Sequence, residues 1–272
     1  MFVDVFKTII LGIIEGITEW LPISSTGHMI IAEEFLKLEV SPEFWKMFLV
    51  VIQLGAILAI VVLFFKNLFP WGFNKTKKET KDTFNLWYKI IIGCLPAALI
   101  GIPLSDKIDE LFFNPGTVAL MLIIYGILFI IVENKQKNKK YRVKEVNKIT
   151  YKDAILVGLF QVLSLIPGTS RSGATILGGL IIGLDRTVAA SYTFYLAVPV
   201  MLGASLIKIL EFGFVFSSFE IIILIVGTLT AFIVSILTIK LLLKYIKKND
   251  FKVFGYYRIL LGLVVILYFL LK

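Results

Sequence analysis

Residues 15–28 read Glu-Gly-Ile-Thr-Glu-Trp-Leu-Pro-Ile-Ser-Ser-Thr-Gly-His and interrupt the long apolar stretch that begins the chain. Two carboxylates, several hydroxyls and the only histidine, His28, are therefore close together in a sequence that is otherwise soluble in lipid. An ionisable group at membrane depth costs about 3 kcal/mol on insertion scales, so such groups are retained where they have a function. This cluster predicts a functional site inside a membrane.

The composition is that of an integral membrane protein. Of the 272 residues, 58% are apolar, and the mean hydropathy is +0.91, well above the values of soluble domains. The net charge of +9 comes from Lys and Arg in loops between apolar stretches, where they indicate cytoplasmic anchors and not a nucleic-acid partner. The single cysteine, Cys94, can form neither an intrachain disulfide nor a thiolate metal site.

Six apolar stretches have the length, about 20 residues, that a helix needs to cross a bilayer. They are residues 45–65, 87–104, 117–133, 188–210, 219–243 and 254–271. Two further apolar regions, 1–38 and 153–184, are each broken near the middle by Pro, Gly, Ser and Thr. Non-helical backbone survives in a bilayer only where protein or water surrounds it, so we expect each region to be a re-entrant helical hairpin. The predicted fold class is an all-α integral membrane protein with six transmembrane helices and two re-entrant hairpins.

The distribution of basic residues predicts the orientation in the membrane. Residues 66–89, 134–152 and 244–252 hold eighteen of the twenty-eight Lys and Arg residues. Six spans put these three loops on one side, and the turns 105–115 and 211–218 on the other. The positive-inside rule then places both termini outside. The first hairpin enters from the exterior and the second from the cytoplasm.

A weak internal repeat relates the two broken regions. The interval of fifteen residues between two glycines, with hydroxyl residues before the second, occurs at 12–27 and again at 158–173. We therefore divide a single membrane domain into pseudo-repeat 1, a basic cytoplasmic loop and pseudo-repeat 2, at residues 1–133, 134–152 and 153–272. Each half contains one hairpin and three spans, and an odd number of spans inverts the second copy. Interrupted segments at corresponding positions of an inverted repeat indicate a site near the midplane.

Glu15 and Glu19 are four residues apart, on one face of a helix, and can share a divalent cation or a proton. A bare like-charged pair in a low dielectric is unfavourable, so a metal or a cationic neighbour is needed. The alternative is a solvated helix face in the membrane interface. Gly12 and Gly16 favour the buried interpretation, because small residues four apart are typical of close helix packing.

Ser24, Ser25, Thr26 and Gly27 lie in the turn that precedes a second helix, whose free N–H groups attract an anion. Helix capping is the more common role for any one of these hydroxyls, and we expect a nucleophile for at most one of them. His28, three residues after Ser25, can act as a base for that hydroxyl or as an acid toward a leaving oxygen.

Arg171 lies in the turn of the second hairpin, in a setting suited to bidentate binding of phosphate. The alternative is a structural ion pair with one of the two glutamates. We assign no special role to the other basic residues. Together these groups are suited to a phosphate or pyrophosphate held at a membrane, with the rest of the substrate in lipid. The predicted phosphate-binding residues are Arg171, Ser24, Thr26, Gly27, Ser170, Ser172 and Thr175.

The chain resembles the undecaprenyl-diphosphate phosphatase family of the BacA/UppP, bacitracin-resistance type. Residues 15–28 and 167–175 match the two signatures of that family, and shorter matches cover nearly the whole chain, including residues 254–258. The resemblance implies hydrolysis of undecaprenyl diphosphate to the monophosphate on the outer leaflet of the bacterial cytoplasmic membrane, which recycles the lipid carrier for cell-wall synthesis. It also implies an inverted-repeat fold and a divalent cation, Mg²⁺ or Ca²⁺, for which we predict Glu15 and Glu19 as ligands.

Five residues match positions that are regarded as essential in the family. They are Glu15, Glu19, Ser25, His28 and Arg171. Two positions depart from the pattern, which often has acidic residues where this chain has Leu49 and Ser191. Because neither lies in a signature, the departures affect peripheral interactions and not the predicted activity.

Two mechanisms and one rival function stay open at this point. Either Ser25 attacks the terminal phosphorus with His28 as base or acid, or His28 activates water and Ser25 is a ligand. The rival function is a transporter or flippase of the polyprenyl phosphate lipid, since inverted repeats with broken helices also build transporters. The expected partners are the polyprenyl diphosphate and membrane lipids, and the sequence leaves a homodimer open.

Overall fold

The computed structural model describes residues 2–71, 75–136 and 140–272, and every regular element in these ranges is a helix. The α-helices are α1 (Phe2–Thr18), α2 (Ser25–Leu36), α3 (Pro42–Val51), α4 (Gln53–Leu63), α5 (Phe65–Leu68), α6 (Lys77–Phe112), α7 (Pro115–Gln136), α8 (Tyr151–Val162), α9 (Arg171–Ile181), α10 (Arg186–Phe212), α11 (Ser218–Ile246) and α12 (Lys252–Leu271). Two short 3₁₀ helices are η1 (Val146–Lys148) and η2 (Leu163–Leu165).

The six predicted transmembrane helices are confirmed in their number and approximate position. The segments long and apolar enough to cross a membrane are Pro42–Leu63, Lys77–Phe112, Pro115–Gln136, Arg186–Phe212, Ser218–Ile246 and Lys252–Leu271. The first of them comprises α3 and α4, which meet at Ile52. The protein is therefore a multi-pass membrane protein.

The boundaries of one span differ from the prediction. Helix α6 contains 36 residues and includes much of what the sequence predicted as the loop 66–89 and the turn 105–115. At 1.5 Å per residue it is about 54 Å long, well beyond a hydrocarbon core of roughly 30 Å. Its start is fixed by a capping box between Thr76 and Glu79, which stabilises a polar first turn that hydropathy does not detect. Residues 72–74 and 137–139, which belong to two of the predicted basic loops, lie outside the described ranges.

Two apolar regions are each divided by chain that is not α-helical. The first break, residues 19–24, separates α1 from α2, and the second break, residues 163–170 including η2, separates α8 from α9. Ser24 and Ser170, the last residues of the two breaks, have φ angles of 74° and 72°. Each is the N-cap of the following helix, and its Oγ accepts a hydrogen bond from the N–H three residues later. The two breaks therefore end in the same local conformation.

Close glycine contacts join each broken helix to a spanning helix. A methyl group built on Gly12 of α1 would lie 2.9 Å from the carbonyl oxygen of Gly227 in α11. One built on Gly158 of α8 would overlap the carbonyl oxygen of Gly93 in α6. No side chain fits at either contact, so the backbones of α1 and α11, and of α8 and α6, approach directly.

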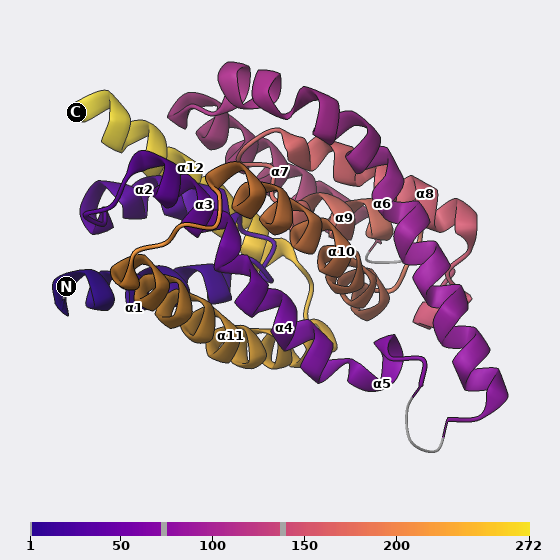
Figure 1. Ribbon diagram of the computed structural model, residues 1–272. Coiled ribbons are helices and arrows are strands. Elements are labelled where there is room, and N and C mark those ends of the chain that lie inside the picture. The colour runs from indigo at the N-terminus through magenta and orange to yellow at the C-terminus, as the bar shows by residue number, and fades with distance from the viewer. Residues whose placement is uncertain (1, 72–74, 137–139) are drawn as a thin grey trace.

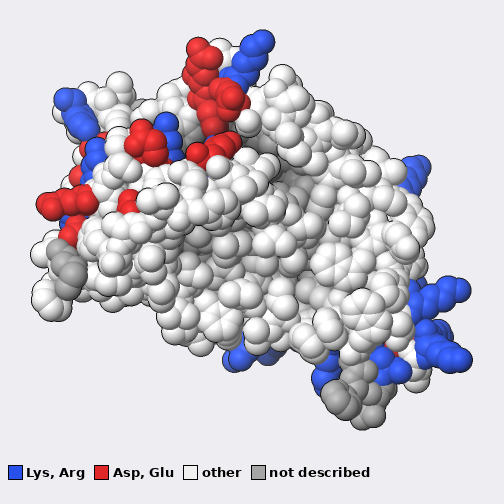
Figure 2. Space-filling model, viewed as in Figure 1, with Lys and Arg blue, Asp and Glu red and all other residues white. Residues whose placement is uncertain are grey.

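The charged side chains separate to the ends of this bundle. The two chain ends lie on the same side of the ribbon, and α6 runs along the opposite edge (Figure 1). Figure 2 shows Lys and Arg gathered around the start of α6, acidic residues mixed with several Lys or Arg at the opposite end, and a broad uncharged band between them. The uncharged band is what contact with lipid requires.

Candidate active site

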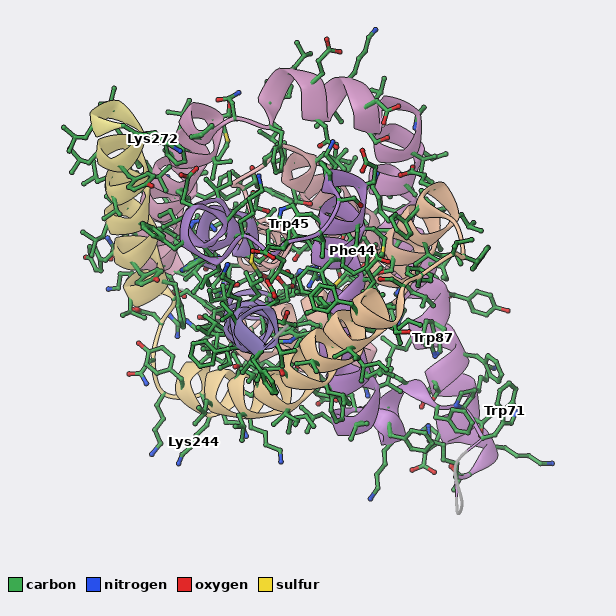
Figure 3. All side chains as sticks on the ribbon, turned by 60° about the vertical axis from the view of Figure 1, so that its left-hand side comes forward. Phe44, Trp45, Trp71, Trp87, Lys244 and Lys272 are labelled. Carbon is green, nitrogen blue, oxygen red and sulfur yellow. The ribbon has the colours of Figure 1, made fainter. Side chains whose placement is uncertain are left out.

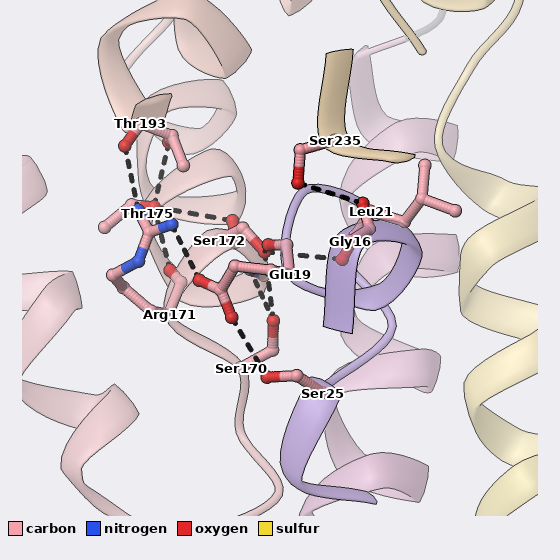
Figure 4. Close-up of polar contacts among 11 residues, drawn as sticks. Gly16, Glu19, Leu21, Ser25, Ser170, Arg171, Ser172, Thr175, Thr193 and Ser235 are labelled. Atoms are coloured by element: carbon pink, nitrogen blue, oxygen red, sulfur yellow. Dashed lines mark hydrogen bonds and ion pairs between the residues drawn. The ribbon is translucent and has the colours of Figure 1, made fainter. Parts of the chain in front are cut away.

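The carboxylate of Glu19 connects the two broken helices. Its Oε1 accepts a hydrogen bond and ion pair from Arg171 at 2.9 Å, and its Oε2 accepts a hydrogen bond from the Ser25 hydroxyl at 3.0 Å. Figure 4 shows Glu19 between these two partners. The side chains of Glu19 and Arg171 are 9% and 11% exposed, so the pair is largely desolvated. The predicted juxtaposition of acidic and cationic groups is therefore present, in the form of the ion pair that the sequence left as an alternative.

Arg171 is held from two further sides. Its Nη1 donates to the carbonyl oxygen of Thr193 in α10 at 2.9 Å, and its guanidinium carbon lies 5.8 Å from the ring centroid of Trp20. Trp20 is fully buried and packs edge-on against Phe194 of α10, with ring centroids 5.3 Å apart. The Nε of Arg171 is buried without a hydrogen-bond partner among the described residues. A buried donor of this kind requires a ligand or water to satisfy it.

Glu15 lies one helical turn before Glu19, on the same face of α1, and is 1% exposed. Its Oε1 has no hydrogen-bond partner in the described part of the chain. Burial raises the pKa of this carboxyl group, and the negative charge of Glu19 raises it further. A buried carboxylate oxygen without a donor is available to a cation or a proton.

The two glutamates fit one common type of divalent-cation site. Within the described ranges no group of three or more His, Cys, Asp and Glu side chains is arranged to hold a metal. Mg²⁺ is commonly bound by one or two carboxylates together with substrate phosphate oxygens and water, so it does not require such a group. The unpartnered Oε1 of Glu15 and the carboxylate of Glu19 match that donor set. The cation remains a prediction.

His28 lies in the first turns of α2 and contacts α12. Its Nδ1 is 2.7 Å from the carbonyl oxygen of Ser24, and its Nε2 is 2.8 Å from the hydroxyl of Tyr257. Since a carbonyl only accepts, Nδ1 carries the proton, and in the neutral ring Nε2 accepts from Tyr257. Burial lowers the pKa of His28 below its ordinary value, which favours this neutral form. The Ser25 hydroxyl donates to Glu19, while both ring nitrogens of His28 have other partners. In this structure the acceptor of the Ser25 hydrogen bond is therefore Glu19 and not His28.

The remaining predicted phosphate-binding residues have internal partners. The hydroxyl of Ser172 donates to the backbone oxygen of Glu19 at 3.0 Å, and that of Thr175 donates to the backbone oxygen of Arg171 at 2.8 Å. Thr26 is half-buried, and the N–H groups of Gly27 and Gly173 donate to the two capping serines. The capping alternative is thus present for Ser24 and Ser170. Binding of phosphate by these residues stays a prediction.

Arg258 of α12 is a residue that the sequence analysis missed. It is fully buried. Its Nη1 donates to the carbonyl oxygen of Pro22 at 3.2 Å, and its Nη2 donates to those of Gly168 and Thr169 at 2.9 Å each. One guanidinium therefore binds the backbone of both breaks. The expectation that basic residues other than Arg171 have no special role is wrong here, and the signal was an arginine inside the last apolar span.

These features define a class of protein: a multi-pass helical membrane protein with carboxylates, a hydroxyl and a guanidinium buried together where two helices are broken. A family model described as "Bacitracin resistance protein BacA" matches residues 8–264, and the chain belongs to this family.

Curated relatives agree over nearly their full length. A protein named "Undecaprenyl-diphosphatase" from Acetivibrio thermocellus is 60% identical over 267 residues, which cover 98% of each chain. The proteins of the same name from Lachnoclostridium phytofermentans and Enterococcus faecalis are 59% identical over 272 residues and 55% identical over 268 residues. They cover 99% and 98% of this chain, and 98% and 97% of their own.

Proposed function

We propose that this protein is a phosphatase that hydrolyses undecaprenyl diphosphate to undecaprenyl phosphate and inorganic phosphate. The names of its full-length relatives support the substrate. The observation that carries the chemistry is the carboxylate of Glu19, which bonds Ser25 on one oxygen and Arg171 on the other. A hydroxyl and a guanidinium, which can bind phosphate, thereby both contact one carboxylate that can act as a base.

In the mechanism that we propose, the Oγ of Ser25 attacks the terminal phosphorus and its proton passes to Glu19 or to His28. The bond between that phosphorus and the bridging oxygen breaks, and undecaprenyl phosphate leaves with the electron pair. Water then hydrolyses the phosphoserine and releases inorganic phosphate. Arg171 turns its unpartnered Nε toward the phosphate oxygens, as charge-assisted donors do. Direct attack by water, activated by His28 with Ser25 as a ligand, stays the alternative.

Glu15 and Glu19 are the residues that would hold a divalent cation, Mg²⁺ or Ca²⁺. When bound, such a cation would supply positive charge against the diphosphate and lower the electrostatic cost of phosphoryl transfer. Glu15 supports this role because its Oε1 is buried and has no donor among the described residues.

We further propose that α1–α2 and α8–α9 are re-entrant hairpins, and that they belong to an inverted repeat. Two matching helix contacts support the repeat, α1 on α11 and α8 on α6, because exchanging the halves maps one onto the other. The identical caps at the two breaks support it as well.

The orientation that we propose follows from the charge of the loops. The basic loops lie in the cytoplasm, both termini lie outside, and the active site opens toward the exterior of the bacterial cytoplasmic membrane.

Phosphate release from undecaprenyl diphosphate by detergent-purified protein tests the proposal. We expect release without any membrane gradient, a strong loss with a chelator, and a fall in kcat of at least about 100-fold in Glu19→Gln. Rapid-quench experiments should trap a phosphoenzyme in the wild type that is absent in Ser25→Ala. A protein that binds the lipid but releases no phosphate would support the transporter instead.

A further inference from the structure

Helix α1 is shorter than the helix it packs on, and this leaves part of α11 uncovered. Ser235 of α11 donates a hydrogen bond to the backbone oxygen of Gly16, near the end of α1. Helix α1 ends at Thr18, while α11 continues to Ile246. The remaining eleven residues of α11 are about 16 Å long. A broken helix that does not cross the bilayer therefore leaves a gap in the leaflet it does not reach.

A groove of about 600 Å³ occupies this gap. Ile17 and Leu21 line the end of the groove beside the first break. Its walls are lined by Leu241, Leu242 and Phe254. Lys244, Lys248 and Asn249 line its other end, where α11 stops. Figure 3 shows Lys244 at the opposite end of the molecule from Lys272, at the end of α11. The groove is thus apolar along its length and basic at one rim.

The charge at this rim is not neutralised by the protein. Lys244 and Lys248 are exposed, and no carboxylate in the described ranges pairs with either of them. The nearest acidic residue in the sequence, Asp250, forms its ion pair with Lys252 at 3.1 Å. Two positive charges therefore face the open end of an apolar groove.

We propose that this groove binds an anionic glycerophospholipid of the leaflet at the lysine-rich face. The acyl chains lie against Leu241, Leu242 and Phe254, and the phosphate lies between Lys244 and Lys248. An anion without a chain would leave the apolar walls exposed, and a neutral lipid would leave two lysines unpaired. The phosphate end of this groove is separate from the proposed active site, since Lys244 lies nine residues, or about 14 Å of helix, beyond Ser235, which bonds Gly16. It therefore does not depend on the proposed hydrolysis.

Native mass spectrometry of detergent-purified protein tests the site, with phosphatidylglycerol and phosphatidylcholine as probes. We expect the double variant Lys244→Gln/Lys248→Gln to bind phosphatidylglycerol about 10- to 30-fold more weakly, because each lysine contributes to anionic lipid binding. The matched control is Lys240→Gln/Lys247→Gln, which removes the same charge from an exposed residue of α11 and from its exposed C-cap residue, neither of which lines the groove. The control should change binding less than twofold, and the wild type should prefer phosphatidylglycerol to phosphatidylcholine at least tenfold.

A second variant tests the apolar wall. Leu241→Trp fills the groove and should weaken phosphatidylglycerol binding by at least about fivefold with all lysines present. Equal losses in both lysine variants would mean a diffuse surface attraction and would overturn the proposal. Unchanged binding in Lys244→Gln/Lys248→Gln, or displacement of phosphatidylglycerol by equimolar undecaprenyl phosphate, would also overturn it. Phosphate release in lipid-free detergent should stay within twofold of wild type in every variant, so this site and the proposed hydrolysis can fail separately.

Discussion

The two breaks share a backbone but differ in their side chains. Ser24 and Ser170 occupy the same left-handed conformation and cap the next helix in the same way. The residue that follows each cap, Ser25 in the first half and Arg171 in the second, bonds a different oxygen of the Glu19 carboxylate. Two equivalent positions thus reach the same group with different chemistry, one with a hydroxyl and the other with a guanidinium.

The helices before the two breaks, α1 and α8, also differ in the charge of their buried side chains. Glu15 of α1 corresponds in the proposed repeat to Gln161 of α8, and both are 1% exposed. The first half therefore supplies negative charge and the second half supplies neutral and positive groups. If the repeat proposed above is present, its centre needs to be asymmetric, because two copies of a buried carboxylate pair would repel each other without a counter-charge.

The largest effect is expected from removing the guanidinium of Arg171, the first residue after the second break. Arg171→Ala should lower kcat by about 100- to 1000-fold, since it removes the proposed donor to the phosphate and leaves Glu19 without its ion pair. Arg171→Lys is the control, because it keeps the charge but not the fork geometry, and should retain intermediate activity. Steady-state phosphate release measures both. Wild-type rates in Arg171→Ala would show that the second half supplies no catalytic group.

Arg258 tests whether the two breaks depend on a common support. Arg258→Met should destabilise the protein by about 3 kcal/mol, because it leaves carbonyl oxygens of both breaks buried without donors. Thermal unfolding in detergent measures this loss. If Arg258 only stabilises the fold, kcat of the remaining folded protein stays normal. If it positions the site, kcat falls about 10-fold or more while Arg258→Lys recovers part of it.

The capping serines test how closely the two breaks correspond. Ser24→Ala and Ser170→Ala should each cost about 1 kcal/mol, because each removes a cap while the backbone stays at positive φ. Ser24→Gly and Ser170→Gly should cost less, since glycine adopts that φ without strain. Unfolding by denaturant compares the four variants. A large difference between the two alanine variants would mean that the breaks are similar in shape but not in energetics.

The sequence predicted the spans and the breaks but not what holds the breaks together. Apolar length sets the six spanning helices, and Pro, Gly and Ser in apolar stretches mark the breaks, so both are local properties of the chain. The contact of Glu19 with Arg171 could also be predicted from the sequence, because a buried charge needs a partner. The hydrogen bonds from Arg258 to both breaks depend on where α12 packs relative to these two distant segments. No local pattern encodes that position.

The extension of α6 was missed for a different reason. Hydropathy reports where a helix meets lipid, whereas the capping box of Thr76 and Glu79 sets where this helix begins. The polar turns beyond the bilayer were therefore predicted as loop.

The smallest effect is expected at the hydrogen bond between His28 of α2 and Tyr257 of α12. Tyr257→Phe removes the hydroxyl 2.8 Å from the Nε2 of His28 but keeps the stacked ring, so kcat should fall only about two- to fivefold.

The pH dependence of the rate tests the role of His28 itself. If His28 accepts a proton in the reaction, activity is lost as the pH falls through its pKa, because the protonated ring cannot accept another. Burial lowers that pKa below 6.5, so the acid limb of the rate profile should lie below pH 6.5. The limb should persist in Tyr257→Phe and disappear from the residual activity of His28→Gln. A limb that is unchanged in His28→Gln would assign the titrating group to the carboxylates and leave Glu19 as the base for Ser25.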